Sequence, residues 1–148
     1  MSHAPVVLHA SAFTSVPDMW HHRVESTPDA EALMFRSSPS SWETLSWRQA
    51  ADRVTRIANA LLAHGLDNEQ RCVVVAETSA EWILADLGIL CAGGATTTIY
   101  PTSTSEECTY ILNDSEARVV FCGTPALVAQ FRRLESGVEV DLPGVVHD

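Results

Sequence analysis

The stretch RCVVVAETSAEWILADLGILCAGGATTTIY, Arg71–Tyr100, carries the pattern that decides the fold. It opens with Arg71–Ala76, an unbroken valine-rich run that is typical of a strand covered on both faces. Thr78-Ser79-Ala80-Glu81 has the form of a capping box and predicts a helix start, and Gly93-Gly94 predicts the end of that helix. Ala95–Tyr100 is the next predicted strand, which the following proline ends. The stretch therefore predicts a β-α-β unit.

The segments on either side extend this alternation. Ser46-Trp47-Arg48-Gln49 is a capping box, followed by apolar residues at helical spacing as far as Gly65. A third box, Thr104-Ser105-Glu106-Glu107, predicts another helix, and Arg118–Cys122 predicts a strand. The sequence thus places a helix before the β-α-β unit, and a helix and a strand after it.

The last elements are a helix and the beginning of a strand. Thr124-Pro125 predicts a helix start with proline in its first turn, and the apolar spacing continues to Leu134. Val145-Val146 is expected to begin a further strand. Alternation of this kind predicts an α/β fold with an open, mostly parallel sheet, right-handed crossovers and flanking helices.

A β-hairpin is predicted ahead of this sheet. Ala32–Arg36 and Trp42–Leu45 flank the turn-rich segment Ser37–Ser40. Residues 1–22 show weak periodicity and are expected to be an N-terminal tail, which leaves residues 23–148 as the folded domain.

The composition excludes several classes of protein. The 148 residues are 46% hydrophobic and 19% charged, which is typical of a globular chain. The formal net charge is −10, and all nine basic residues are arginines. This balance disfavours nucleic acid and anionic membranes as partners. The absence of lysine excludes a Schiff-base mechanism and a P-loop lysine within this chain.

Other sequence features predict a cytoplasmic protein without a transmembrane segment. The longest mainly apolar stretch, Ile83–Ala95, is too short to cross a bilayer, and residues 1–12 have no signal-peptide pattern. No two of the four cysteines form a C-x-x-C pair, so reduced thiols are expected.

Ligands of open α/β sheets bind at the carboxyl ends of the strands, here Ala76–Thr78, Tyr100–Ser103 and Cys122–Thr124. None of these segments contains a glycine-rich nucleotide motif. The hydroxyl-rich run Thr96–Ser105 could contact phosphate at a helix N-terminus, but helix capping is a sufficient role for these side chains.

A few isolated residues have a chemical and a structural interpretation. Cys122 lies just before a helix start, where a thiol could be activated, although packing is the simpler role. His21-His22 could bind metal or be a solvated pair, and His64 is expected near a helix C-terminus. Trp42, Trp47 and Trp82 are interpreted as packing residues.

Residues from about Trp42 to Cys122 resemble the N-terminal region of the AMP-forming adenylate ligases, the acyl-CoA synthetase family. The matching stretches are LSWRQAADRVTRIANALLAHGL, the segment from Arg71 to Phe121 and, more weakly, RVESTPDAEALMFR. The combination of EWILADLGILCAGG with TIYPTSTSEEC is most similar to the long-chain fatty acyl-CoA ligase branch. The resemblance implies that residues 23–148 are a partial N-terminal AMP-binding subdomain.

Members of that family are several times longer and use ATP, Mg²⁺ and coenzyme A to convert a carboxylic acid, here a fatty acid, into a thioester. Their phosphate loop ending in Pro-Lys-Gly, their adenine motif and their catalytic lysine have no counterpart in this sequence. We therefore assign no catalytic, cofactor-binding or metal-binding residue, and expect no strong binding of these cofactors by this chain.

Three hypotheses follow from the sequence. The first is an N-terminal scaffold fragment of a long-chain fatty acid–CoA ligase, inactive alone, whose exposed apolar faces meet the rest of the ligase or a second copy. The second is a freestanding, non-catalytic binding or interaction module derived from that family. The third is a small thiol enzyme that uses Cys122.

Overall fold

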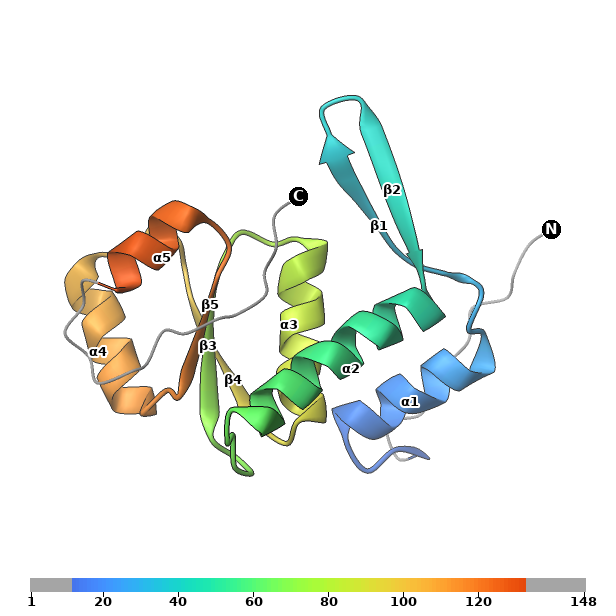
Figure 1. Ribbon diagram of the computed structural model, residues 1–148, viewed down its shortest axis with the longest axis horizontal. Helices are drawn as coiled ribbons and strands as arrows, with labels where there is room; N and C mark the ends of the chain where they lie inside the picture. The colour runs from blue at the N-terminus through green and yellow to red at the C-terminus, as the bar shows by residue number, and fades with distance from the viewer. Residues whose placement is uncertain (1–11, 133–148) are drawn as a thin grey trace.

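The computed structural model describes residues 12–132 and contains a small parallel sheet between helices, with a hairpin beside it (Figure 1). The elements in chain order are α1 (Val16–Ser26), β1 (Glu31–Ser38), β2 (Ser41–Ser46), α2 (Trp47–Ala63), β3 (Arg71–Val75), α3 (Ala80–Cys91), β4 (Ala95–Ile99), α4 (Ser105–Ser115), β5 (Val119–Cys122) and α5 (Pro125–Phe131). The predicted hairpin and α/β alternation are confirmed. The strands of the main sheet exclude the predicted end residues Ala76, Tyr100 and Arg118, and both hairpin strands are longer than predicted.

The three strands of the main sheet are parallel and lie in the order β4-β3-β5. Val73 of the central strand pairs with Thr97 on one side and Val120 on the other. Because β3 lies in the middle, the chain runs from β3 to one edge of the sheet and then crosses to the other edge.

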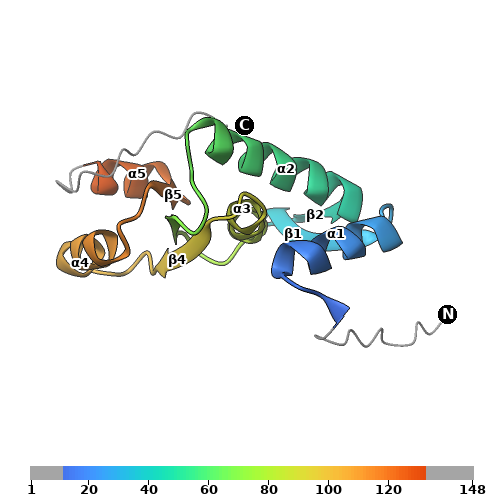
Figure 2. The same ribbon diagram turned by 90° about the horizontal axis from the view of Figure 1, so that it is seen from below.

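The alternation of side chains along β3 divides the core into two layers. Val73 and Val75 pack with α4 and α5 on one face, whereas Cys72 and Val74 pack with α2 and α3 on the other. Figures 1 and 2 show these helix pairs on opposite sides of the sheet. Burial on both faces explains why β3 has no polar alternation.

Side-chain caps begin the helices, as the sequence predicts. Ser46 with Gln49 and Thr104 with Glu107 form complete capping boxes. The box predicted at Thr78 is wrong by one residue, because Ser79 is the N-cap and its Oγ accepts from the backbone N–H of Trp82. Glu81 then lies in the first turn, where its charge complements the helix dipole.

Two glycines follow helix ends in the left-handed conformation that the sequence anticipates. Gly65 follows α2 with a φ of 80°, and Gly93 follows α3 with a φ of 83°. Glycine adopts this conformation without a Cβ clash, which lets the chain reverse immediately after each helix.

Helix α1 was not predicted and covers part of the expected tail. Ser15 caps it through the backbone N–H of Asp18, and Trp20 is its one buried residue. One buried residue gives almost no periodic signal in a sequence. Trp20 reaches the core through a contact with the ring of Trp47, at 5.6 Å between centroids, and Arg23 lies 4.5 Å from the centre of that same ring.

The β1–β2 hairpin packs one face against the helices and leaves the other face open. Leu45 is buried, and Leu33 and Phe35 pack against the same cluster. Arg36 and Trp42 pair on the opposite face, with the guanidinium 5.3 Å from the ring centre. The packing role predicted for Trp42 is therefore wrong, since 61% of its surface is exposed.

Two predictions fall outside the described residues, namely the continuation of the last helix to Leu134 and the strand at Val145-Val146. Within residues 12–132, none of the helices combines the length and the hydropathy that a bilayer crossing requires.

Candidate functional site

The carboxyl ends of β3, β4 and β5 meet at one edge of the sheet, where the following loops lead into α3, α4 and α5. This edge is the expected ligand position of an open α/β sheet. β3 leads into α3 on one face of the sheet, and β5 leads into α5 on the opposite face. In open α/β sheets a crevice is expected where successive connections change face, which here is between β3 and β5.

The residues that follow β3 and β5 are in direct contact with each other. The backbone N–H of Gly123 donates to Val75 O at 2.9 Å. A Cβ built on Gly123 would lie 2.6 Å from the Cβ of Ala76, so the two loops touch. The contact between β3 and β5 therefore continues one residue past the last paired residues of these strands.

The hydroxyls that begin the three helices already have partners. Thr104 Oγ1 accepts from the backbone N–H of Glu107, and the Glu107 carboxylate accepts from the Thr104 backbone N–H at 2.8 Å. Ser79 and Thr124 likewise accept from backbone N–H groups three residues ahead.

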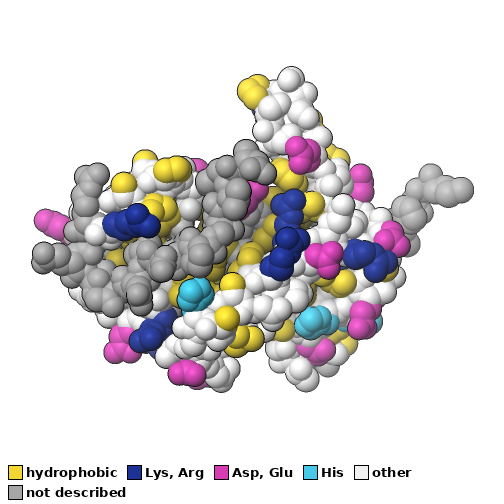
Figure 3. All heavy atoms as spheres, in the orientation of Figure 1, with side chains coloured by type: hydrophobic (Ala, Val, Ile, Leu, Met, Phe, Trp, Pro, Cys, Tyr) yellow, Lys and Arg dark blue, Asp and Glu magenta, His cyan; other side chains and the backbone are white. Residues whose placement is uncertain are grey.

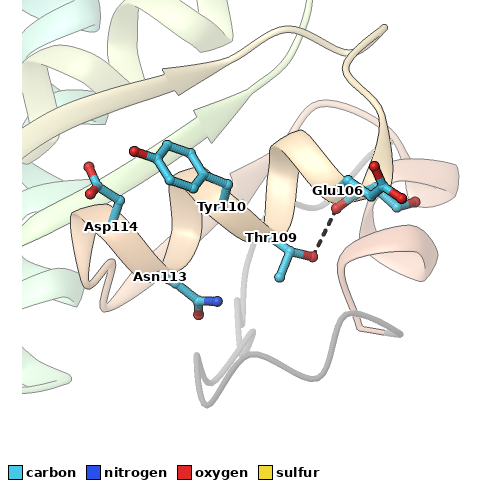
Figure 4. Close-up of a pocket in the computed structure, with 6 residues that line it drawn as sticks. Glu106, Thr109, Tyr110, Asn113 and Asp114 are labelled. Atoms are coloured by element: carbon cyan, nitrogen blue, oxygen red, sulfur yellow. Dashed lines mark hydrogen bonds between the residues drawn. The ribbon is translucent and has the colours of Figure 1, made fainter.

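The hydroxyl-rich run Thr96–Ser105 has the capping role that the sequence suggested for it. Within it, Thr104 and Ser105 belong to the start of α4, and the hydroxyl of Thr109 in turn donates to the Ser105 carbonyl at 2.8 Å (Figure 4). The run comprises Thr96–Ile99 of β4, the turn that follows and the start of α4. At each of the three helix starts, the side chain of the N-cap residue accepts a hydrogen bond from one backbone N–H of the first turn.

The exposed face of α4 forms a shallow, open depression of about 700 Å³ (Figure 4). All of its lining side chains come from α4: Ser105, Glu106, Thr109, Tyr110, Asn113 and Asp114. In Figure 4 Tyr110 lies along the helix between Asp114 and Thr109. A single helix cannot enclose a ligand, so this depression is a surface feature.

The thiol of Cys122 does not fit the role of a nucleophile. Cys122 is buried in the layer beneath α4 and α5, and this burial raises its pKa to about 11. A thiol with that pKa is almost entirely protonated at neutral pH, and the thiolate is the reactive form. The thiol-enzyme hypothesis is therefore contradicted by the environment of Cys122.

The histidines considered in the sequence lie apart from the sheet edge. His21 and His22 are exposed on α1, where His22 lies 5.3 Å from the ring of Phe13. His64 is the C-cap of α2, as expected from its place before Gly65. Among residues 12–132, no three metal-binding side chains come together.

Charged side chains do not form a separate site on the face seen in Figure 3, where arginines and acids are interspersed. Two ion pairs are present among the described residues. Arg48 contacts Asp29 at 3.1 Å, and Arg71 contacts Glu116 at 3.0 Å. The second pair joins the start of β3 to the end of α4 and so supports the sheet.

Comparison with known proteins identifies the family. The sequence profile of the AMP-binding enzymes matches residues 20–147. The chain belongs to the AMP-binding enzyme family. Long-chain-fatty-acid–CoA ligase FadD15 of Mycobacterium tuberculosis is 31% identical over 97 residues, which are 66% of this chain and 16% of the ligase. Tyrocidine synthase 3 of Brevibacillus parabrevis is 33% identical over 102 residues, 69% of this chain and 2% of the synthase.

Solved structures of adenylate-forming ligases share the fold of this AMP-binding family member. A Legionella pneumophila fatty acyl-adenylate ligase, solved with acyl adenylate and pyrophosphate, superposes with a TM-score of 0.73 at 22% identity, over 84% of this chain and 23% of the ligase. VinN superposes with a TM-score of 0.78 at 15% identity, over 86% of this chain and 33% of VinN. The chain thus spans a third or less of these relatives.

The family resemblance inferred from the sequence is confirmed, and it rests on the scaffold. The match to both ligases and peptide synthetases means that the shared residues mark the family and not one branch. Sequence reasoning missed the contact between Gly123 and Ala76, which no local pattern signals.

Proposed function

We propose that this chain is the N-terminal scaffold segment of an ATP-dependent long-chain fatty acid–CoA ligase. The main support is the family match across residues 20–147 together with coverage of 16% of a ligase such as FadD15. In this proposal the complete ligase uses ATP and Mg²⁺ to adenylate a fatty acid in the cytoplasm, and then transfers the acyl group to coenzyme A.

The chain by itself is proposed to be inactive. Attack of a carboxylate on the α-phosphate of ATP develops negative charge, which requires Mg²⁺ and preorganised cations. The sequence contains no lysine, and the helix starts at the sheet edge are capped by the chain's own side chains. The role of this segment is then to support the sheet on which the remaining parts of the ligase are built.

A chimera with FadD15 tests this function. Residues 20–147 replace the matching segment of the M. tuberculosis ligase, and fatty-acid-dependent exchange between ATP and pyrophosphate is measured, followed by acyl-CoA formation. We expect exchange from the chimera and none from the isolated chain. Exchange by the isolated chain would contradict the inactivity, and a folded chimera without exchange would contradict the role as a ligase scaffold.

The alternative function is a freestanding interaction module derived from the same family. Its support is that the described residues form three clusters of buried apolar side chains among themselves. Light scattering on the pure chain distinguishes the two. A stable monomer, combined with a folded but inactive chimera, favours the module, whereas self-association of the isolated chain favours a scaffold segment with uncovered apolar faces.

A further inference from the structure

Helix α1 is held against the rest of the chain by a few side chains. Trp20 is its one buried residue, and its ring lies against that of Trp47 in α2. Val24 is partly buried in the same cluster, and Arg23 lies over the Trp47 ring. Within residues 12–132, every hydrogen bond made by a side chain of residues 14–26 ends within residues 14–27, and neither ion pair includes α1. Trp20 therefore provides most of the attachment.

The residues that follow α1 are anchored by hydrogen bonds to the start of α2. The carbonyl of Pro28 accepts from the backbone N–H of Arg48 at 2.8 Å. The carbonyl of Ala30 accepts from the backbone N–H of Trp47 at 3.1 Å, and the Asp29 carboxylate contacts the Arg48 guanidinium at 3.1 Å. A movement of α1 would therefore take place ahead of this anchor, where the helix ends.

The closed position of α1 coincides with an unsatisfied donor. The indole Nε1–H of Trp47 is buried and has no hydrogen-bond partner among the described residues. A buried donor without an acceptor costs free energy, because it has given up its hydrogen bond to water. Since Trp20 and Arg23 of α1 lie against this same ring, release of α1 would bring water to it.

A released α1 would not remain a stable helix. It has 11 residues, and isolated helices shorter than about 12–15 residues are marginal in water. Release would therefore be coupled to local unfolding of the segment, which makes its backbone amides available for exchange with solvent.

We propose that α1 is a strap that opens and closes independently of the sheet. The strap is Val16–Ser26, and its hinge is Thr27, where backbone angles of φ −148° and ψ 63° end the helix. In Figures 1 and 2 α1 lies beside α2, at the end of the molecule opposite α4 and α5. Opening uncovers Trp47 and the apolar cluster behind it, which contains Leu45 and Leu84. The proposal does not depend on the proposed function, and its test measures no activity.

Residue-level hydrogen exchange of the full chain tests the strap. We expect the amides of residues 19–26 to exchange at least about tenfold faster than those of β3, after correction for intrinsic rates. The amides of Trp47 and Arg48, which form the anchor, should exchange more slowly than those of α1. Equal rates in α1 and β3 would mean that α1 opens only when the whole chain unfolds, which overturns the proposal. Exchange of the two anchor amides at the α1 rate would overturn the hinge.

A substitution at Trp20 tests what holds the strap closed. Trp20→Ala should accelerate exchange in α1 by about tenfold or more and leave the β3 amides within about twofold of the parent chain. Met19→Ala is the matched control, because Met19 is the neighbouring residue of the same helix and is 38% exposed. The control should exchange like the parent chain. Equal acceleration in α1 and β3 by Trp20→Ala would show that this residue supports the whole fold, and overturns the proposal.

A milder variant is available should Trp20→Ala unfold the whole chain. Arg23→Gln removes the cation over the Trp47 ring and keeps Trp20 in place. We expect exchange in α1 to become about threefold faster, with β3 unchanged, since an exposed cation–π contact is weak. Equal acceleration in both elements, or none in α1, overturns the proposal.

Discussion

Gly123 and Ala76 are in contact where β5 and β3 end, since a Cβ on Gly123 would lie 2.6 Å from the Cβ and 3.1 Å from the Cα of Ala76. Gly123→Ala is therefore expected to destabilise the chain by about 1–3 kcal/mol through overpacking. Urea unfolding followed by circular dichroism measures the loss.

Exchanging the two residues provides the control for this contact. Ala76→Gly makes room for the new methyl group, so the double variant should recover much of the stability lost in Gly123→Ala. If the changes in unfolding free energy of Gly123→Ala and Ala76→Gly simply add in the double variant, the clash is relieved elsewhere and the strand ends are not in firm contact.

A second close approach joins two helices. A Cβ on Gly88 in α3 would lie 2.4 Å from Cγ2 of Ile57 in α2. Alanine normally favours a helix over glycine by about 1 kcal/mol, but here the clash should prevail and Gly88→Ala should lower the thermal midpoint. Adding Ile57→Ala should make the Gly88→Ala step less costly, and a higher midpoint for Gly88→Ala alone would contradict the packing.

Alkaline pH should weaken the fold through two buried thiols. Desolvation raises the pKa of Cys72 and of Cys122 from 9.0 to about 11. Above pH 9 the unfolded chain loses these protons while the folded chain keeps them, so their contribution is complete below pH 9 and disappears as the pH approaches 11. Each thiol contributes at most about 1.4 kcal/mol per pH unit in that range.

Urea unfolding at pH 8 and pH 10.5, under reducing conditions, measures this decline. The Cys72→Ala, Cys122→Ala double variant serves as the control, because it retains every tyrosine and arginine. Its free energy of unfolding should fall less steeply with pH than that of the parent chain, and an equal slope would exclude the thiols as the cause.

The four cysteines should differ in reactivity toward a thiol reagent. Cys72, Cys108 and Cys122 are buried, whereas Cys91 is partly exposed. In the folded chain at pH 7.5 we expect Cys91 to react first and the other three to react at the rate of unfolding. Mass spectrometry of peptides after brief alkylation identifies the sites, and early labelling of Cys122 would restore the case for a reactive thiol.

Helix α4 depends on its N-terminal capping box. Thr104→Ala removes the acceptor for the backbone N–H of Glu107 and should cost about 1 kcal/mol. Glu107→Gln keeps an acceptor for the backbone N–H of Thr104 and should cost less. Chemical denaturation compares the two, and equal losses would show that the charge of Glu107 matters more than the hydrogen bonds.

Features that depend on neighbouring residues along the chain could be predicted from the sequence. The capping boxes at Ser46 and Thr104 and the reversal at Gly65 are confirmed because short-range hydrogen bonds and backbone freedom determine them. The box at Thr78 failed by one position because two adjacent hydroxyls could both serve as the cap, and Ser79 does so.

The position of the candidate site could be predicted from the sequence, but the contacts made there could not. That ligands of such a sheet bind at the carboxyl ends of its strands follows from general rules for α/β folds, and the sequence contains no glycine-rich nucleotide motif. The strand order β4-β3-β5 was not predicted. The contact of Gly123 with Ala76 brings together residues 47 positions apart, and nothing in either local sequence indicates it. The burial of Cys122 likewise comes from distant helices.

The order of residues alone was sufficient for the type of every described element except α1, for most helix starts and for membership of the family. These features depend on local hydrogen bonding and on side-chain periodicity. Three-dimensional packing was needed to place α1 against α2 through Trp20 and to leave Trp42 exposed. It also determined that α5 lies on the same face of the sheet as α4. These outcomes depend on which apolar side chains, far apart in the sequence, are buried against one another, and this is determined only in the folded chain.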